Sequence, residues 1–231
     1  MRKTIRLVAM SKMDGGGVCI TGIDEETGRW LRPVKVTGGV SKVDLYDEDG
    51  ELMQPLDLVS FDLVKRDTHP PHIEDRVTDF SKLVSIVRRP GDLARSKLLP
   101  SLCEASPDEV LFQKKRSLVL IEPTEILSAS FAPDSWGKYK VRLSFSLDGR
   151  DYLGEANEPR YPVTDLRLRN WGRRFRTRRE FSGRQLRSAL GVDRIFLVMG
   201  LSRPYRGQCW PMVVGFHSVP DFEGEIDLDR P

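Results

Sequence analysis

The chain has 231 residues, of which 39% are hydrophobic and 31% are charged, and its formal net charge at pH 7 is +3. This composition is typical of a globular protein and excludes an intrinsically disordered chain. No stretch approaches the length of apolar sequence that a transmembrane helix needs. The short apolar run that ends at Met10 is followed at once by Lys12 and Asp14, so we expect no signal peptide and a cytoplasmic protein.

The first half of the chain predicts short strands separated by turns. Apolar residues alternate with polar ones at a period of two, and Gly, Pro and Asp interrupt the pattern. Residues 91–103 predict a short helix that Pro100 stops, because proline lacks the backbone N–H of a helix interior. The predicted strands of this half are residues 4–10, 18–24, 29–34 and 56–64, and residues 79–87 predict a helical turn followed by a strand.

The second half repeats this pattern and adds one helical region. Residues 160–187 contain the most favourable helix of this half, and the acidic tail 220–231 is expected to fray or to cover an edge. Strands at a spacing of about 8–12 residues are typical of small barrels or sandwiches. The predicted strands are residues 117–123, 125–130, 138–145, 151–155, 194–201 and 209–217.

Charge is distributed unevenly along the chain. Between Arg160 and Arg206 there are 13 Lys or Arg and 3 Asp or Glu, a local balance of +10. The rest of the chain carries 24 basic and 31 acidic residues, a balance of −7. This asymmetry predicts a local surface that faces a polyanion.

Arginines within this segment are interspersed with aromatic residues. A guanidinium binds phosphate in a bidentate manner and stacks on bases, and aromatic rings add stacking surfaces for single strands. Alternatively, these arginines pair with the acidic remainder of the chain, with an acidic protein partner or with other anions. A second group, around Trp30, could stack and clamp in the same way, unless Trp30 is a core residue. The predicted nucleic-acid-binding residues are Arg29, Trp30, Arg32, Arg160, Arg167, Arg169, Trp171, Arg173, Arg174, Arg176, Arg178 and Arg179.

Other polar clusters are weaker candidates for chemistry. Residues 69–75 hold His69, His72, Glu74 and Asp75, which could bind a metal or move protons, but their spacing matches no metal motif, and a rigid loop is the preferred interpretation. Asp165 is expected to cap a helix, and its alternative role is an acid near a phosphate-binding surface. Cys19, Cys103 and Cys209 are too widely spaced for a disulfide framework or a zinc site.

Four sequence elements together resemble the bacterial dual OB-containing domain family. Residues 19–24 (CITGID) and 27–34 (TGRWLRPV) resemble its N-terminal hairpin, and residues 161–165 (YPVTD) resemble its "Y-x-V-T-D" element. Residues 69–75 resemble its proline-containing loop, although HPPH stands where the family has an aromatic-Gln-Pro type of sequence. Residues 195–214 resemble its closing pair of strands. The resemblance implies two OB-type barrels and, by analogy of fold alone, nucleic-acid binding.

We therefore predict a mainly β chain with two small OB-like β-barrels and short helical insertions, divided into residues 1–112 and 113–231, the second unit carrying the arginine-rich insertion. The predicted function is non-catalytic binding of single-stranded DNA or RNA, with no metal, no cofactor and no membrane. One alternative is a protein-interaction module of a multi-component bacterial system that docks an acidic partner. Another is a metal-dependent enzyme acting on nucleic acid, with Glu74, Asp75 and Asp165 as ligands.

Overall fold

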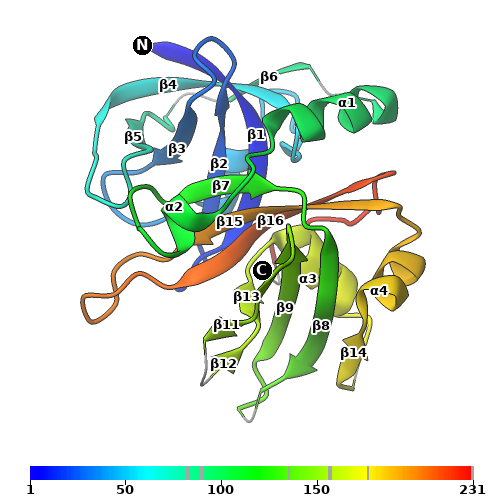
Figure 1. Ribbon diagram of the computed structural model, residues 1–231. Coiled ribbons are helices and arrows are strands. Elements are labelled where there is room, and N and C mark those ends of the chain that lie inside the picture. The colour runs from blue at the N-terminus through cyan, green and yellow to red at the C-terminus, as the bar shows by residue number, and fades with distance from the viewer. Residues whose placement is uncertain (82–83, 89–90, 135, 156–157, 176, 230–231) are drawn as a thin grey trace.

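The computed structural model describes residues 1–81, 84–88, 91–134, 136–155, 158–175 and 177–229. It contains two β-structures stacked one above the other, with the long pair β15 (Arg194–Leu201) and β16 (Pro211–Val219) running between them (Figure 1). None of the described helices is long and apolar enough to cross a membrane.

Five strands of the N-terminal half close into a barrel, which we call the first barrel. Its order is β1-β2-β3-β5-β4, and β4 pairs again with β1 to close the ring. The β3–β5 pair is parallel and the other pairs are antiparallel. The strands are β1 (Arg2–Lys12), β2 (Val18–Asp24), β3 (Trp30–Val34), β4 (Leu58–Arg66) and β5 (Asp75–Thr78), and β6 (Ser85–Arg88) adds to β4, while a 3₁₀ turn, η1, spans Lys42–Leu45.

Two helices connect the first barrel to the second half of the chain. They are α1 (Asp92–Leu102) and α2 (Asp108–Leu111). The predicted helix over residues 91–103 is confirmed, but the expected stop at Pro100 is wrong, because Pro100 lies inside α1, which continues to Leu102.

The second half forms a larger sheet, which we call the second sheet. Its order is β14-β8-β9-β13-β16-β15-β7, with β10 paired to β9 and a parallel β13–β16 pair. Fully buried Phe131, Phe145 and Phe216 fill its core. The remaining elements are β7 (Leu118–Ile121), β8 (Glu125–Pro133), β9 (Tyr139–Leu147), β10 (Arg150–Tyr152), β11 (Gly154–Glu155), β12 (Glu158–Pro159), β13 (Tyr161–Val163), α3 (Leu166–Gly172), β14 (Arg179–Phe181) and α4 (Gly183–Leu190). The predicted mainly β class with two OB-type units is confirmed, whereas the boundary at residues 112 and 113 stays a prediction.

Residues 160–187 contain a helix, α3, as the sequence predicts, but the arginines of this segment do not lie on one long helix. Helix α3 has only seven residues and ends at Gly172. A Cβ at this position would lie 2.2 Å from the ring of Phe131, so only glycine fits here without a shift of the ring or of the backbone. The chain then turns into β14, which pairs with β8, and α4 follows.

The first barrel and the second sheet meet where β1 crosses β16. A bulge in β1 leaves Val8 without a partner in the β1–β2 register. Its carbonyl instead accepts a hydrogen bond of 2.6 Å from Nε2 of the buried His217 in β16. Gly215 lets the strands approach, because a Cβ there would lie 2.9 Å from both the Val8 oxygen and the Ala9 side chain. Apolar residues from both units bury this junction.

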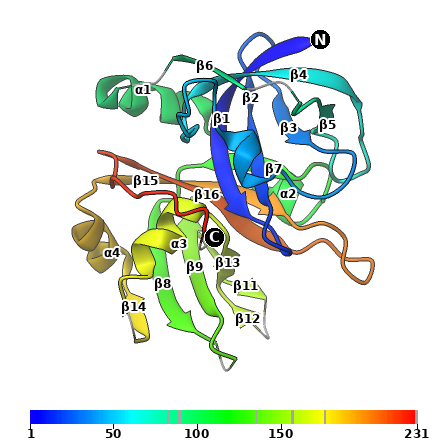
Figure 2. The ribbon, with the colours of Figure 1, turned by 180° about the vertical axis from the view of Figure 1, so that it is seen from behind.

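The described part of the C-terminal tail, up to residue 229, is packed rather than frayed. Phe222 is buried and contacts Phe216 edge to face at 5.4 Å. Asp221 accepts from Arg167 of α3 at 2.7 Å, and farther along Ile226 and Leu228 pack on the core of the first barrel. Figure 2 shows the tail, in red, passing beside α3. The tail therefore contacts both units. Of the two expectations for it, covering describes its position and fraying does not.

Candidate functional site

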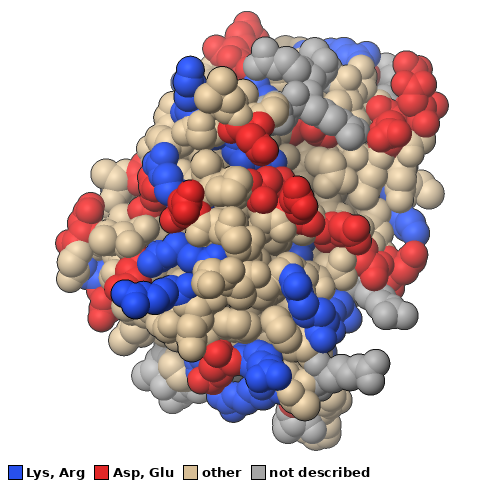
Figure 3. Space-filling view, turned by 90° about the vertical axis from the view of Figure 1, so that its right-hand side faces the viewer, with Lys and Arg blue, Asp and Glu red and all other residues tan. Residues whose placement is uncertain are grey.

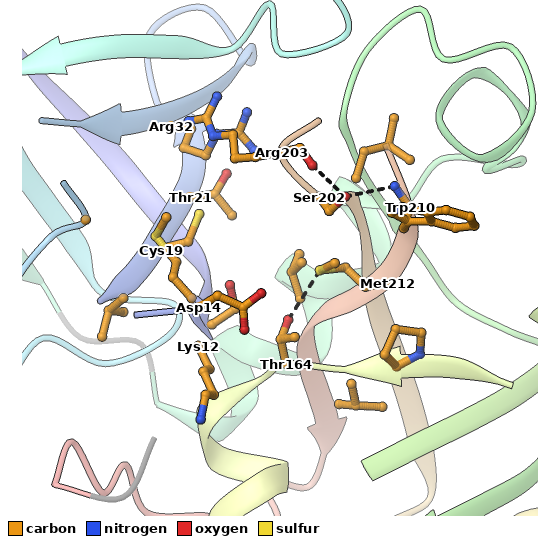
Figure 4. Close-up of a pocket in the computed structure, with 18 of the residues that line it drawn as sticks. Lys12, Asp14, Cys19, Thr21, Arg32, Thr164, Ser202, Arg203, Trp210 and Met212 are labelled. Carbon is orange, nitrogen blue, oxygen red and sulfur yellow. Dashed lines mark hydrogen bonds between the residues drawn. The ribbon is translucent and has the colours of Figure 1, made fainter. Parts of the chain in front are cut away.

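A cavity of about 900 Å³ lies between the first barrel and the second sheet. We call it the cleft. One wall comes from the ends of β1, β2 and β3 and the loop of residues 35–40, and the other from β9, β13, β16 and the loop of residues 201–210. Figure 4 shows side chains from both walls pointing into this space, among them Lys12 and Thr21 from one side and Thr164 and Met212 from the other.

Basic side chains dominate the walls of the cleft. Among the described residues, eight Lys or Arg line it, against two acidic residues, Asp14 and Asp67. Several of these cations keep carboxylate partners, such as Lys140 with Asp134 at 3.3 Å. The surplus nevertheless leaves the cleft positively charged, which favours an anionic ligand. The basic residues are Lys12, Arg32, Lys35, Lys138, Lys140, Arg142, Arg169 and Arg203.

Like charges crowd one end of the cleft. Burial, followed by the nearby charges of Arg169, Lys138 and Arg173, lowers the pKa of Lys12 below its usual value. Burial, followed by the charge of Arg173, also lowers the pKa of Arg169. Arg169 donates to the carbonyl oxygens of Val163 and Tyr139 at 3.4 and 3.3 Å, and its Nε has no acceptor among the described residues. An anion bound at this end of the cleft would relieve the repulsion between these cations.

Aromatic side chains stand at the other end, on the loop that joins β15 to β16. Tyr205 is 63% exposed and Trp210 is 38% exposed, and both line the cleft. The backbone N–H of Trp210 donates to Oγ of Ser202 at 2.9 Å, which restrains the main chain that carries the ring (Figure 4). The cleft thus combines cations with exposed rings that planar groups can stack on.

A buried polar network braces the wall that carries Arg32. Nε of Arg32 donates to Asp75 at 2.6 Å, and Nη2 donates to Nδ1 of His72 at 2.8 Å. Because arginine only donates, Nδ1 accepts, and Nε2 carries the proton that His72 donates to the Ser202 carbonyl at 3.0 Å. Burial, followed by the charges of Arg32 and Arg203, lowers the pKa of His72 to about 4.

This network also crosses between the two units. Arg203, on the loop after β15, donates to the second oxygen of Asp75 at 2.5 Å. Glu74 accepts from both the N–H and the hydroxyl of Ser117 at 2.9 Å. Residues 69–75 therefore form a rigid loop at the edge of the cleft, which was the preferred interpretation of this segment.

The three carboxylates of the metal hypothesis have structural partners instead. The side chain of the fully buried Asp165 accepts from the N–H of Leu168 at 2.7 Å and from that of Phe216 at 3.1 Å. Its expected capping role is confirmed, and burial raises its pKa to about 6. Within the part of the chain that the structure describes, no group of three His, Cys, Asp or Glu is arranged to hold a metal ion.

Of the predicted binding residues, the structure places Arg32 and Arg169 in the cleft wall. Arg29 is exposed outside the cleft, at the start of β3. Trp30 is half-buried against the junction between the two units, with its Nε1 3.5 Å from Glu104. The position of Trp30 therefore agrees better with a core residue than with an exposed ring that stacks on a base.

The remaining predicted arginines are scattered. Arg167 is buried, and Asp221 and the Gly224 carbonyl accept from it at 2.7 and 2.6 Å. Arg160 and Arg178 both pair with Glu180. Arg179 is exposed on β14, and Arg176 lies outside the described residues.

Trp171 belongs to an aromatic cluster rather than to an open surface. It packs against Phe131, Phe175 and Phe181, with ring centroids 5.3–6.1 Å apart. The guanidinium of Arg174 lies 4.2 Å from the Trp171 ring and covers it, while that of Arg173 lies 5.4 Å from the Tyr139 ring. Much of the arginine segment thus stabilises the second sheet itself.

Most of the cleft residues were not among the sequence-predicted candidates. Lys138, Lys140 and Arg142 alternate with apolar residues along β9, so their common face could have been recognised as a basic one. Lys12 and Arg203 lie 191 positions apart in the chain and carry no local signal.

Charge on the outer surface is mixed. Figure 3 shows large groups of Lys and Arg in the lower half of the face on the α4 side, and Asp and Glu interspersed with further Lys and Arg across its middle and upper parts.

The comparisons with known proteins give one match. The family model described as "Dual OB-containing domain" matches residues 3–216, which is most of the chain. Neither the curated proteins nor the solved structures include a match to this sequence. The family resemblance predicted from the four sequence elements is confirmed.

Proposed function

Since the chain belongs to the dual OB-containing domain family, we propose that it binds single-stranded nucleic acid in the cleft between its two OB-type units. The observation that carries this proposal is the cleft lining, in which eight Lys or Arg face two Asp and exposed Trp210 and Tyr205 stand at the rim. A positively charged groove with aromatic rings is the arrangement that binds single strands with little sequence preference. OB folds commonly take such ligands, although they also bind sugars and proteins.

The size of the cleft favours a single strand over a duplex. A cavity of about 900 Å³ admits a few nucleotides, and it lies within the range of roughly 300–1,000 Å³ for small-ligand sites. A duplex would have to place two strands and the base pairs between them in the same volume. Walls on both sides of the cleft allow bases to stack at the rim while phosphates reach the crowded cations around Lys12.

Fluorescence anisotropy with a labelled single-stranded oligonucleotide tests the proposal. We expect affinity to fall steeply with salt, because phosphate contacts release counterions. Lys138→Glu removes one exposed cation of the cleft and should reduce the slope of log affinity against log salt by about 1. The matched control is Arg184→Glu, an equal change of charge at an exposed position on α4 outside the cleft.

Two results would contradict the proposal. One is binding at low salt no tighter than that of a neutral control protein. The other is an equal loss of affinity in both variants, which would show attraction by net charge alone. Competition with polyglutamate tests the alternative of an acidic protein partner. Polyglutamate and unlabelled nucleic acid are compared at equal concentrations of negative charge. If polyglutamate displaces the labelled oligonucleotide at the lower concentration, an acidic protein partner is favoured.

A further inference from the structure

Trp136 is the most exposed large apolar side chain of the described residues, with 91% of its surface open to solvent. It stands at the tip of the hairpin between β8 and β9. The carboxylate of Asp134 accepts from the N–H groups of Trp136 and Lys138 at 2.9 and 2.8 Å, and Gly137 takes a φ of +74°. The backbone around the ring is therefore well fixed, while the ring itself is left almost fully exposed by the residues that the structure describes. Exposing so large an aromatic surface costs free energy unless a ligand covers it.

A row of cations leads from Trp136 into the cleft. Lys140 and Arg142 share one face of β9, because successive side chains of a strand point to opposite faces, and Lys138 directly precedes this strand. Two residues of a strand span roughly 6.6 Å, a repeat similar to the distance between neighbouring phosphates of an extended single strand. All three cations line the cleft, so the row begins inside it and ends two residues from the exposed ring.

The basic surface also continues beyond the cleft on the other side of this row. A second hollow of about 320 Å³ shares Lys140 and Arg142 with the cleft and adds Arg160 and Arg178. Among the described residues that line it, Asp134 alone is acidic, and Glu180 pairs with both Arg160 and Arg178. A chain of phosphates leaving the cleft would thus meet positive charge along β9 on both flanks.

We propose that Trp136, Lys138, Lys140 and Arg142 form a binding arm that runs from the wall of the cleft to the tip of the β8–β9 hairpin, on which a single strand leaving the cleft lays its phosphates and stacks one base on Trp136. This inference rests on the proposed function and adds that the ligand is a polymer with bases, longer than the cleft. A polyanion without bases could use the cations and would gain nothing from the Trp136 ring.

The test compares Trp136→Ala and Trp136→Phe on two labelled strands of equal length, one with thymine bases and one abasic. Trp136→Ala should weaken binding of the thymine strand by about 5- to 150-fold, the range that one stacked base supplies. Trp136→Phe should retain most of the affinity, and the abasic strand should bind all three proteins equally. The matched control is Phe112→Ala, at a 52% exposed aromatic residue that lines neither cavity.

The outcomes separate this inference from the proposed function. Equal binding of the thymine strand by the wild type and Trp136→Ala would overturn the arm and leave the cleft proposal standing. An equal loss on both strands would also overturn it, because the effect would not depend on bases. Failure of the wild type to bind either strand would refute both. A thermal melt confirms that each variant is folded, which the exposure of Trp136 leads us to expect.

Discussion

Replacing His217 with glutamine should remove a large part of the acid sensitivity of the fold. Burial, followed by the charges of Arg95 and Arg167, lowers the pKa of His217 to about 3, against the hydrogen bond to Val8 and the charge of Asp221. His217 is therefore neutral in the folded protein at ordinary pH. The unfolded chain protonates it near pH 6.5. Its contribution to stability is complete above pH 6.5 and is lost as the pH falls towards 3.

The magnitude follows from the size of the pKa shift. One pH unit within this window corresponds to about 1.4 kcal/mol, so the change from pH 7.5 to pH 5 should cost about 2 kcal/mol of unfolding free energy. The full shift corresponds to about 5 kcal/mol near pH 3. Glutamine cannot take up the proton, and its amide can still donate to the Val8 carbonyl.

Urea unfolding at pH 7.5 and pH 5, followed by tryptophan fluorescence, measures the difference. The wild type should lose about 2 kcal/mol more than His217→Gln over this interval. The lowered pKa of His72 also reduces the free energy of unfolding as the pH falls. The raised pKa of Asp165 has the opposite effect and makes the fold more stable as the pH falls from 6 to 4. Both groups are present in both proteins, so they cancel in the comparison. Parallel loss of stability in the two proteins would refute the assignment of a neutral, buried His217.

Two further changes test the junction and the cleft wall by the same unfolding assay. Gly215→Ala should cost about 1–3 kcal/mol, because the added methyl group would lie 2.9 Å from the Val8 oxygen and the strands must separate; an unchanged urea midpoint would show that β1 and β16 shift freely. Arg32→Ala should cost about 3–5 kcal/mol, because it removes a partner of the buried Asp75 and of His72; a loss below 1 kcal/mol would show that Arg203 alone satisfies the carboxylate.

The sequence predicted individual strands well, since alternation at a period of two is a local property. It also predicted the capping role of Asp165, because a cap acts within four residues. It did not predict where the arginine segment turns, which depends on Phe131 packing against Gly172 from a strand far away in the chain. The density of arginine indicated a basic region correctly, but not that Arg167 would pair with Asp221, 54 residues later.

The cleft escaped prediction for a related reason. Its walls bring Lys12 together with Lys138 and Arg169, and such a meeting depends on how two OB-type units dock. No pattern within a window of neighbouring residues contains that information. What could be recognised locally was the basic face of β9.

The crossing of β1 over β16 has a thermodynamic consequence. Each unit supplies only one wall of the cleft. A ligand in the cleft would therefore bind only when the two units are docked, and it would stabilise their docking. At a concentration of 100 times its Kd, such a ligand adds about 2.7 kcal/mol to the stability of docking. A ligand of the proposed kind would therefore stabilise the same docked arrangement that the hydrogen bond between the Val8 carbonyl and His217 holds together.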